Sequence, residues 1–471
     1  MKRIPNYILI FSLLCSLLMA ACSKSFITKT PSDSLPAGQA LNDSSALQTA
    51  LYGAYSELRA TNCYGRSIPL LGDLQSDNTY VEIRNAGRYL SDFNYSVAVN
   101  DGVALGIWQD LYAVIERANA IIDAKPTGPL ADQVKAQAYG LRGLCYFKLV
   151  NLFAKPYTDD KTGLGVPLVL HYDLTYLPKR SPIDSVYTQI VSDFKTALTH
   201  APDYTASTYL SYYSIEALLA RAYLYMGDNA DAEKAAVDVI NNSGFTLVDP
   251  AHFGAFWANP GIQSDAVEVM FEVDVDIHNN NGSDDLSLIF SPDGYQDIYA
   301  SSQLYNLYSS TDVRQSLLIP GLTKNTIPAY LINKFSNGAN PADRDNLKVI
   351  RLAEVYLIAA EAALPGDEAT ALSYLNALMA QRDPSFPGYS STGAQLLSDI
   401  VTERRKELAF EGDRLSDLNR LKLPINRVAN QGAIPGPLTI AYPDNRRVQP
   451  IPQSEVQVNP NIAGQQNPGY N

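Results

Sequence analysis

The stretch that decides the fold is Ser214-Ile-Glu-Ala-Leu-Leu-Ala-Arg-Ala-Tyr-Leu-Tyr-Met-Gly-Asp228, followed closely by Ala230-Asp-Ala-Glu-Lys-Ala-Ala236. Its apolar residues recur at the spacing of one helix face, which predicts helices over 212–226 and 229–241. Gly227 stands where the first helix must end, because glycine accommodates left-handed backbone angles. Small alanines let the two helices approach closely. The stretch therefore predicts a tight helix-turn-helix unit.

The same period recurs along the chain. A second pair is expected over 349–364 and 368–382, joined by Pro365-Gly-Asp367, and further helices over 108–124, 131–153 and 183–201. Such degenerate helix pairs are typical of tetratricopeptide (TPR)-like repeats. We therefore expect a mostly α protein, a single large α-helical domain with TPR-like helix-turn-helix pairs over about 108–244 and 349–420, long loops and a few short β-strands.

The helical period fades between about 249 and 346. Gly, Asn, Pro and Tyr dominate there, as in Asn279-Asn-Asn-Gly-Ser-Asp-Asp285. Residues 266–273 alternate apolar and acidic side chains, which predicts a strand. Because long loops on a large domain usually carry function, we interpret 249–346 as the loop-rich, ligand-side region.

Composition excludes several classes of protein. With 46% hydrophobic residues and 30 Tyr among 471, the chain is too apolar and aromatic to be disordered. Lys and Arg number 36 against 49 Asp and Glu, giving a formal net charge of −13. That balance argues against a nucleic-acid partner, since phosphates require a basic footprint.

The first residues indicate export and lipidation. Lys2 and Arg3 precede an apolar stretch of about 14 residues, too short for a permanent membrane helix, which predicts a signal peptide over 1–21. It ends Leu18-Met-Ala-Ala-Cys22, the pattern that a lipoprotein signal peptidase accepts, so Cys22 is the predicted lipidation site. An ordinary secretory cleavage beside an incidental cysteine is the alternative. Residues 22–40 suit a flexible lipidated tether, and 41–471 the globular domain.

Three further motifs join this lipoprotein start. They are Ile350-Arg-Leu-Ala-Glu-Val-Tyr-Leu-Ile-Ala-Ala-Glu-Ala362, Glu403-Arg-Arg-Lys-Glu-Leu-Ala-Phe-Glu-Gly-Asp-Arg-Leu-Ser-Asp-Leu-Asn-Arg420, and a C-terminal end with Pro450-Ile-Pro-Gln-Ser-Glu-Val-Gln-Val-Asn-Pro460 and Asn467-Pro-Gly-Tyr470. Together they resemble the SusD/RagB family of nutrient-binding outer-membrane lipoproteins. The resemblance covers nearly the whole mature chain.

This resemblance implies a function as well as a fold. It implies a non-catalytic protein, anchored by lipid in the outer membrane and exposed at the cell surface, that captures a glycan (an oligosaccharide or polysaccharide). It also implies delivery to a partner, a SusC-like TonB-dependent transporter. A peptide ligand, as for RagB, is the main alternative. A surface glycoside hydrolase, which requires paired carboxylates in a cleft, and a plain TPR scaffold are further alternatives.

Candidate ligand-binding residues come from aromatic and amide side chains on the expected loops. Aromatic rings stack on the C–H faces of sugars, while amides and carboxylates hydrogen-bond the hydroxyls. The candidates are Asn78, Tyr80, Trp257, Tyr295, Gln296 and Tyr299. Partial burial at helix–loop contacts is the competing explanation for each aromatic side chain. Trp108 instead opens a periodic helix and is expected in the core.

Charged residues in the family motifs favour structure over chemistry. We expect a helix over 403–414 with Glu403 and Lys406 paired across one turn. Arg404, Arg405, Glu411 and Arg414 are expected in packed ion pairs. Glu354 and Glu361 are expected as polar positions of a repeat helix. No catalytic residue is assigned.

Cysteines and acidic clusters indicate no cofactor. Cys145 lies at helical spacing among leucines, which favours a buried free thiol, and a Cys63–Cys145 disulfide is the alternative. The oxygen-rich segment 274–285 leaves a loose calcium site open, although the EF-hand spacing fails there. No zinc pattern is present.

Overall fold

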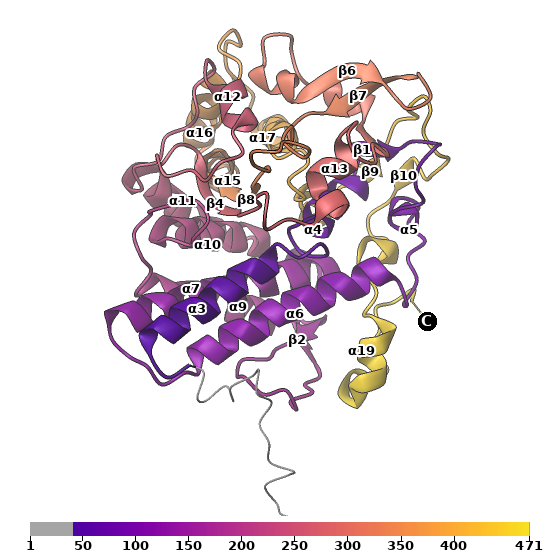
Figure 1. Ribbon diagram of the computed structural model, residues 1–471. Coiled ribbons are helices and arrows are strands. Elements are labelled where there is room, and N and C mark those ends of the chain that lie inside the picture. Colours follow the sequence, from indigo (N-terminus) through magenta and orange to yellow (C-terminus); the bar gives the residue numbers. More distant parts are fainter. Residues whose placement is uncertain (1–40, 471) are drawn as a thin grey trace, which may run out of the picture.

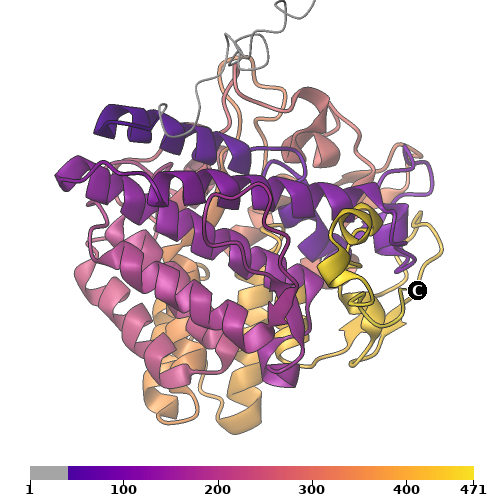
Figure 2. The ribbon, with the colours of Figure 1, turned by 90° about the horizontal axis from the view of Figure 1, so that it is seen from below.

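The computed structural model describes residues 41–470, which fold around helices that pack on one another in sequence order. Figure 2 shows the long helices lying side by side. Members of this series are α3 (Ser44–Leu58), α6 (Gly102–Ile122), α7 (Pro129–Phe153), α9 (Ile183–Leu198), α10 (Tyr212–Met226), α11 (Asn229–Asn242), α15 (Leu352–Ala363) and α16 (Glu368–Ala380). The expected mostly helical fold with TPR-like pairs is confirmed.

Shorter elements complete the domain around this series (Figure 1). The other α-helices are α4 (Ser67–Leu74), α5 (Leu90–Phe93), α8 (Tyr157–Asp160), α12 (Phe253–Ala258), α13 (Leu286–Phe290), α14 (Ser302–Tyr305), α17 (Gly393–Glu407), α18 (Arg414–Arg420) and α19 (Gln453–Val458). Single 3₁₀ turns are η2 (Gly282–Asp284), η3 (Val313–Leu317), η4 (Asn445–Arg447) and η5 (Pro460–Ile462).

The strands are short and antiparallel. They are β1 (Thr79–Val81), β2 (Leu164–Pro167), β3 (Arg180–Pro182), β4 (Val269–Val273), β5 (Ile298–Ala300), β6 (Leu318–Leu322), β7 (Pro328–Ile332), β8 (Leu347–Arg351), β9 (Ile425–Asn426) and β10 (Thr439–Ile440). The four-stranded sheet has the order β1-β5-β7-β6, and β2–β3, β4–β8 and β9–β10 form pairs. Three of the four strands in the larger sheet come from the loop-rich region, so that region supplies most of this sheet.

The turns of the two predicted helix pairs form as the residues dictate. Gly227 ends α10 at φ 75°, and the side chain of Asp228 accepts a hydrogen bond from the Asp231 amide. In the second pair the side chain of Asp367 accepts from the Ala369 and Thr370 amides. These aspartates satisfy backbone donors that a helix start leaves free.

Several predicted helices have different bounds, and α6, expected from Trp108, begins already at Gly102. The helix expected from 349 begins only at Leu352, because Val349 and Ile350 belong to β8, which pairs with the predicted strand β4. The helix expected over 403–414 ends at Glu407. Phe410 and Gly412 then adopt positive φ angles of 68° and 90°, and the turn leads into α18.

The core contains the residues expected there. Trp108 is buried and packs edge-on against Phe153 with ring centroids 5.0 Å apart. Cys63 and Cys145 are both buried free thiols, so the alternative of a disulfide between them is wrong. Burial raises the pKa of both thiols, because a thiolate is poorly solvated away from water.

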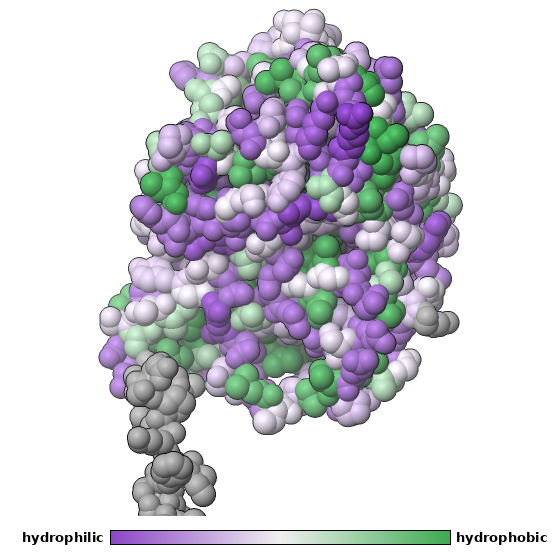
Figure 3. All heavy atoms as spheres, turned by 45° about the vertical axis from the view of Figure 1, so that its right-hand side comes forward, coloured by the Kyte–Doolittle hydropathy of each residue, from purple (hydrophilic) through white to green (hydrophobic). Residues whose placement is uncertain are grey.

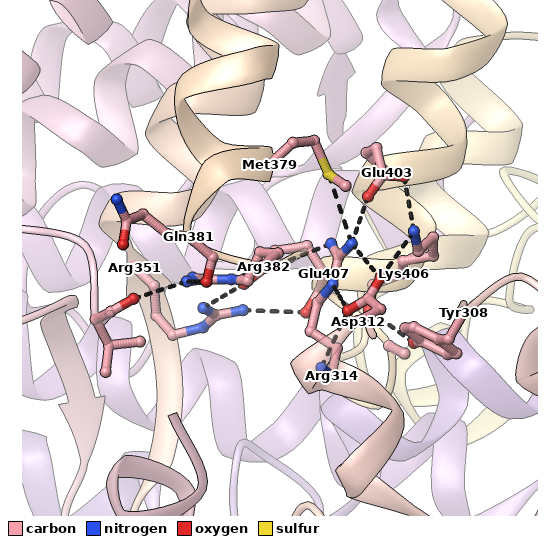
Figure 4. Close-up of polar contacts among 12 residues, drawn as sticks. Tyr308, Asp312, Arg314, Arg351, Met379, Gln381, Arg382, Glu403, Lys406 and Glu407 are labelled. Atoms are coloured by element: carbon pink, nitrogen blue, oxygen red, sulfur yellow. Dashed lines mark hydrogen bonds and ion pairs between the residues drawn. The ribbon is translucent and has the colours of Figure 1, made fainter. Parts of the chain in front are cut away.

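A buried network of charges joins the helical series to the strands (Figure 4). The Glu407 carboxylate accepts hydrogen bonds from Arg314, Arg351 and Arg382 at 3.0–3.1 Å. Lys406 Nζ lies 2.8 Å from Glu403 Oε1, which confirms that pair. Buried charges persist only when they are fully paired, so this network fixes how α17 sits against β8 and α16.

The remaining motif charges are also structural. Arg404 bridges Glu354 and Asp417 at 2.8 Å each, and Arg420 pairs with Glu361. Arg405 and Arg414 both bind the Asp77 carboxylate, at 3.2 and 2.9 Å. Glu411 pairs with Arg351 and Lys334. The expected packed ion pairs are therefore confirmed.

The signal peptide (1–21), Cys22 and the tether (22–40) lie outside the described residues. Between residues 41 and 470, no helix is both long and apolar enough to cross a membrane. The face in Figure 3 is largely hydrophilic, with hydrophobic residues in small groups.

Candidate functional site

One face of the molecule is built from loops around the edge of the four-stranded sheet. It combines the turn after β1, the segment around η2 and α13, and the loop before β7. We call it the loop face and define it by the exposed or half-buried Arg88, Asp284, Tyr295 and Lys324, together with the buried Arg66, Glu82 and Asp297 that they contact or adjoin. Aromatic, basic and acidic side chains meet there although they are far apart in sequence.

Tyr80 and Tyr299 form the floor of this region. They are direct partners in the β1–β5 register, and their rings stack at a centroid distance of 5.7 Å and an angle of 24°. Tyr80 is 4% exposed and Tyr299 0%. The pair was predicted as two ligand contacts, and the structure brings the two rings together but covers nearly all of their surface.

Tyr295 precedes β5 in the chain and is half-buried. The guanidinium of Arg88 stacks on its ring at 3.8 Å from the centroid, and Arg88 Nη1 lies 2.5 Å from Asp284 Oδ1. Arg66 Nη1 reaches the same oxygen at 2.6 Å. A guanidinium that lies over an aromatic ring and is paired with a carboxylate is held in place, and it keeps further donors for a ligand.

The charge of Asp284 is stabilised by these two arginines. Partial burial acts to raise its pKa, but the hydrogen bond from Arg88 and the charges of Arg66 and Arg88 outweigh burial, so the pKa is lowered. The carboxylate, with 41% of the side chain exposed, is therefore an acceptor at neutral pH. It has the character of a binding group and not of a proton donor.

A second ion pair borders the same face. Lys324 Nζ lies 2.9 Å from Asp297 Oδ1, and Asp297 Oδ2 accepts from the Ala86 amide at 2.9 Å. Asn325 hydrogen-bonds the buried Glu82. These contacts hold the loop before β7 against the turn after β1.

A pocket of about 300 Å³ opens beside the tyrosine floor. Its lining includes Thr79, Tyr80, Arg427, Asn430 and Leu438. Leu438 is 50% exposed, whereas Arg427 is held by backbone carbonyls of Leu74, Ser76 and Phe93. The pocket is of the size that small-molecule sites have.

Three predicted site residues have other surroundings. Asn78 is fully buried, donating to Asp73 Oδ1 at 2.6 Å and accepting from Arg405 Nε at 2.8 Å. Trp257, 4% exposed, belongs to α12 and packs on Phe256 and under Lys334. Gln296 is 9% exposed and adopts a positive φ of 47°. Asn78 and Trp257 hold the fold together, and neither offers a surface to a dissolved ligand.

Sequence reasoning missed Arg88 and Asp284. They lie 196 positions apart and meet only through tertiary packing. Both residues lie in segments without a periodic pattern, so the sequence gives no signal that connects them. Among the described residues, no group of three or more His, Cys, Asp or Glu side chains is arranged to hold a metal ion.

The fold and the loop face together define a helical, repeat-built ligand-binding protein. Comparison with protein-family models matches residues 307–470 to the SusD family and residues 26–225 to a family described as starch-binding associating with outer membrane. The chain belongs to the SusD/RagB family, a family of non-catalytic binding proteins.

Individual relatives agree over nearly the whole length. A SusD superfamily protein from Bacteroides thetaiotaomicron is 30% identical, with a TM-score of 0.83, covering 90% of this chain and 100% of that one. A putative sugar binding protein from Bacteroides vulgatus is 27% identical, with a TM-score of 0.83, covering 92% and 100%. SusD-like protein P2 of Formosa agariphila is 28% identical over 90% of this chain and 92% of its own.

Proposed function

We propose that this protein is a lipid-anchored, cell-surface binding protein that captures a glycan on its loop face. The observation that carries the proposal is the half-buried Tyr295 ring, with the Arg88 guanidinium over one face and Asp284 paired to that guanidinium. Sugars offer flat C–H faces and many hydroxyls, and this arrangement combines an aromatic surface with charged hydrogen-bonding groups.

Two comparisons support a sugar ligand over other classes. One matching family model is described as starch-binding, and a relative that is matched along its whole length is described as a putative sugar binding protein. The acidic balance of the chain disfavours polyanionic ligands. We include in the proposal delivery of the bound glycan to a SusC-like TonB-dependent transporter in the outer membrane.

The organisation we propose follows the sequence: a signal peptide over 1–21, a tether over 22–40 acylated at Cys22, and one domain over 41–471. Substituting Cys22→Ser should abolish incorporation of labelled palmitate and release the protein from the membrane fraction. Retention of the label in that variant would contradict the lipidation site.

Co-purification of the tagged wild-type chain with a TonB-dependent barrel tests the transport role.

Native affinity electrophoresis tests glycan capture directly. Gels containing soluble starch, laminarin or other polysaccharides should retard the wild-type protein, without release of reducing sugar. Tyr295→Ala should move faster in the retarding gel, whereas Tyr176→Ala, which removes a 54% exposed tyrosine from another surface, should not. Release of reducing sugar would contradict a binding protein, and retention of peptides only would favour the peptide alternative.

A further inference from the structure

A second aromatic pocket lies away from the loop face, between α3, the turn over 206–209 and the end of β4. Its volume is about 370 Å³. We call it the tyrosine pocket and define it by Tyr52, Tyr55, Arg59, Tyr209, Asp274 and Asn279, all of which line it. In Figure 1, α3 and β4 lie well apart from β1, the strand at the loop face.

The spacing on α3 explains how three of these side chains share the pocket. Residues 52, 55 and 59 are separated by three and four positions, so they lie on one face of the helix. That face is directed at the 206–209 turn and β4, and Tyr52 on it is 49% exposed. Tyr209 beside it is 38% exposed, so the two side chains form a continuous aromatic patch, a feature that can mark a binding surface.

The tyrosine rings form a built platform. Tyr209 lies 5.9 Å from Tyr52 and 5.4 Å from Tyr55 between ring centroids. Tyr55 is fixed from below, because its hydroxyl donates to Gln137 Oε1 and accepts from the Leu210 amide, each at 2.8 Å. The hydroxyls of Tyr52 and Tyr209 have no hydrogen-bond partner among residues 41–470. The floor is rigid, and the upper two hydroxyls are open to a ligand.

Polar groups border the platform. Arg59 donates to the Asp274 carbonyl and to Ser56 Oγ, each at 3.0 Å, so its guanidinium is held in place. The Asp274 carboxylate is 35% exposed, and within the described chain it accepts no hydrogen bond, with Arg59 Nη1 3.8 Å away. It therefore has free acceptor positions for hydroxyl groups at the edge of the rings.

We propose that the tyrosine pocket is a second carbohydrate-binding subsite, which takes a neutral sugar ring of a longer glycan. Exposed rings with a free carboxylate suit the C–H face and hydroxyls of a sugar. A neutral sugar is favoured over an acidic one, because Asp274 and Glu272 line the pocket and its one cation, Arg59, is already engaged. The proposal rests on the proposed glycan capture and adds a site to it.

One segment connects this pocket to the loop face. Residues 274–285 line the tyrosine pocket with Asp274 and Asn279, and they hold Asp284 on the loop face. The segment is pinned to α3 where Asn281 Nδ2 donates to the Arg59 carbonyl at 2.8 Å. Two subsites on one molecule raise the apparent affinity for a long chain far more than for a short one.

The test compares long and short glycans on defined variants. Wild type, Tyr52→Ala/Tyr209→Ala and Tyr295→Ala are titrated with whichever of soluble starch or laminarin retards the wild type, and with the matching hexasaccharide. Loss of the pocket rings should weaken polysaccharide binding roughly threefold to tenfold, from the usual contribution of an aromatic contact. Hexasaccharide affinity should change less.

Two further variants keep the result interpretable. Tyr52→Phe/Tyr209→Phe keeps the rings and should retain most binding, and Asp274→Asn alters the free acceptor without touching the rings. Thermal unfolding checks that each variant is folded. Unchanged polysaccharide affinity in the folded Tyr52→Ala/Tyr209→Ala protein, with affinity lost in Tyr295→Ala, would overturn the second subsite and leave the proposed function standing.

Discussion

Arg351 and Glu407 lie 3.0 Å apart with both side chains excluded from solvent, and they join strand β8 to the end of α17 across 56 positions of sequence. Glu407 simultaneously neutralises Arg314 and Arg382. One carboxylate thus lies at the centre of three guanidinium groups. We expect the stability of the domain to depend strongly on this carboxylate, because without it three buried arginines would lose a partner.

Glu407→Gln should therefore destabilise the protein strongly. It leaves the surrounding arginines with too little negative charge, and breaking a buried pair typically costs about 3–5 kcal/mol. Urea unfolding followed by circular dichroism measures the loss, with Glu116→Gln on the exposed face of α6 as the control. Equal midpoints for the two variants would contradict a central role for Glu407.

Acid should weaken the same junction. Burial acts to raise the pKa of Glu407, but the charges of Arg382, Arg351 and Arg314 outweigh it and hold the pKa well below its usual range. A lowered folded-state pKa adds stability above the unfolded value near 4, and that stability is lost as the pH falls toward the folded pKa. The free energy of unfolding of Glu407→Gln should therefore fall less steeply than that of wild type as the pH is lowered below about 4.

Gly412 should not tolerate a side chain. Its φ is +90°, and a Cβ there would lie 2.5 Å from the Cα of Pro69 in α4. Gly412→Ala should therefore lower the free energy of unfolding by about 2 kcal/mol or more, through strain and steric overlap. The matched control is Gly53→Ala in α3, where no atom lies within 4 Å and the helix should gain about 0.5–1 kcal/mol. Thermal unfolding of the two variants provides the measurement. A Gly412→Ala midpoint equal to that of wild type would contradict the prediction.

Asp92 should make stability depend on pH in the opposite direction. Burial, and next the charge of Asp101, raise its pKa to about 8, and neither carboxylate oxygen has a hydrogen-bond partner among the described residues. The folded protein therefore keeps a proton that the unfolded chain releases near pH 4, so stability falls as the pH rises from about 4 to about 8.

Replacing that group with a neutral one should remove the effect. Asp92→Asn should be more stable than wild type at pH 8 by at least about 1 kcal/mol, and nearly equal to it at pH 4. Chemical denaturation at the two pH values provides the measurement. A variant less stable than wild type at pH 8 would show that the carboxylate is ionised and paired in the folded protein.

Arg88 should matter for binding and little for stability. Its ion pair with Asp284 is partly exposed, and such pairs contribute about 0–1 kcal/mol. Arg88→Ala removes the guanidinium from the Tyr295 ring and should weaken glycan binding by roughly tenfold. Arg446→Ala, which breaks an exposed pair with Asp444, is the control. Isothermal titration calorimetry should show weaker glycan binding for Arg88→Ala than for Arg446→Ala. Equal affinities of the two variants would contradict a role for Arg88 in binding.

The helical half of the fold could be predicted because its information is local. Apolar spacing and turn residues such as Gly227 lie within one repeat, so the α10–α11 pair follows from its own sequence. The end of α17 did not follow, because the strands and arginines that fix Glu407 come from distant segments. The charged residues keep a helical spacing beyond Glu407, which is why the sequence predicted a helix that continues to 414.

The candidate site was harder to predict for the same reason. Tyr80 and Tyr299 are aromatic residues near loops, and the sequence indicates them equally with Trp257. Tyr80 and Tyr299 stack only because of the sheet register, and Trp257 is buried because of how α12 packs. Arg88 gains its significance from Tyr295 and Asp284, about 200 positions away, and no local pattern carries that information.

The charge network has a consequence for how the protein is made. Its carboxylates are distributed from Glu268 to Glu411, so a growing chain that has not yet reached Glu407 can pair Arg351 and Arg382 only with Glu268. The junction can close only after almost nine-tenths of the chain is available. A chain still in synthesis therefore lacks this junction, which is compatible with the export across a membrane that we propose.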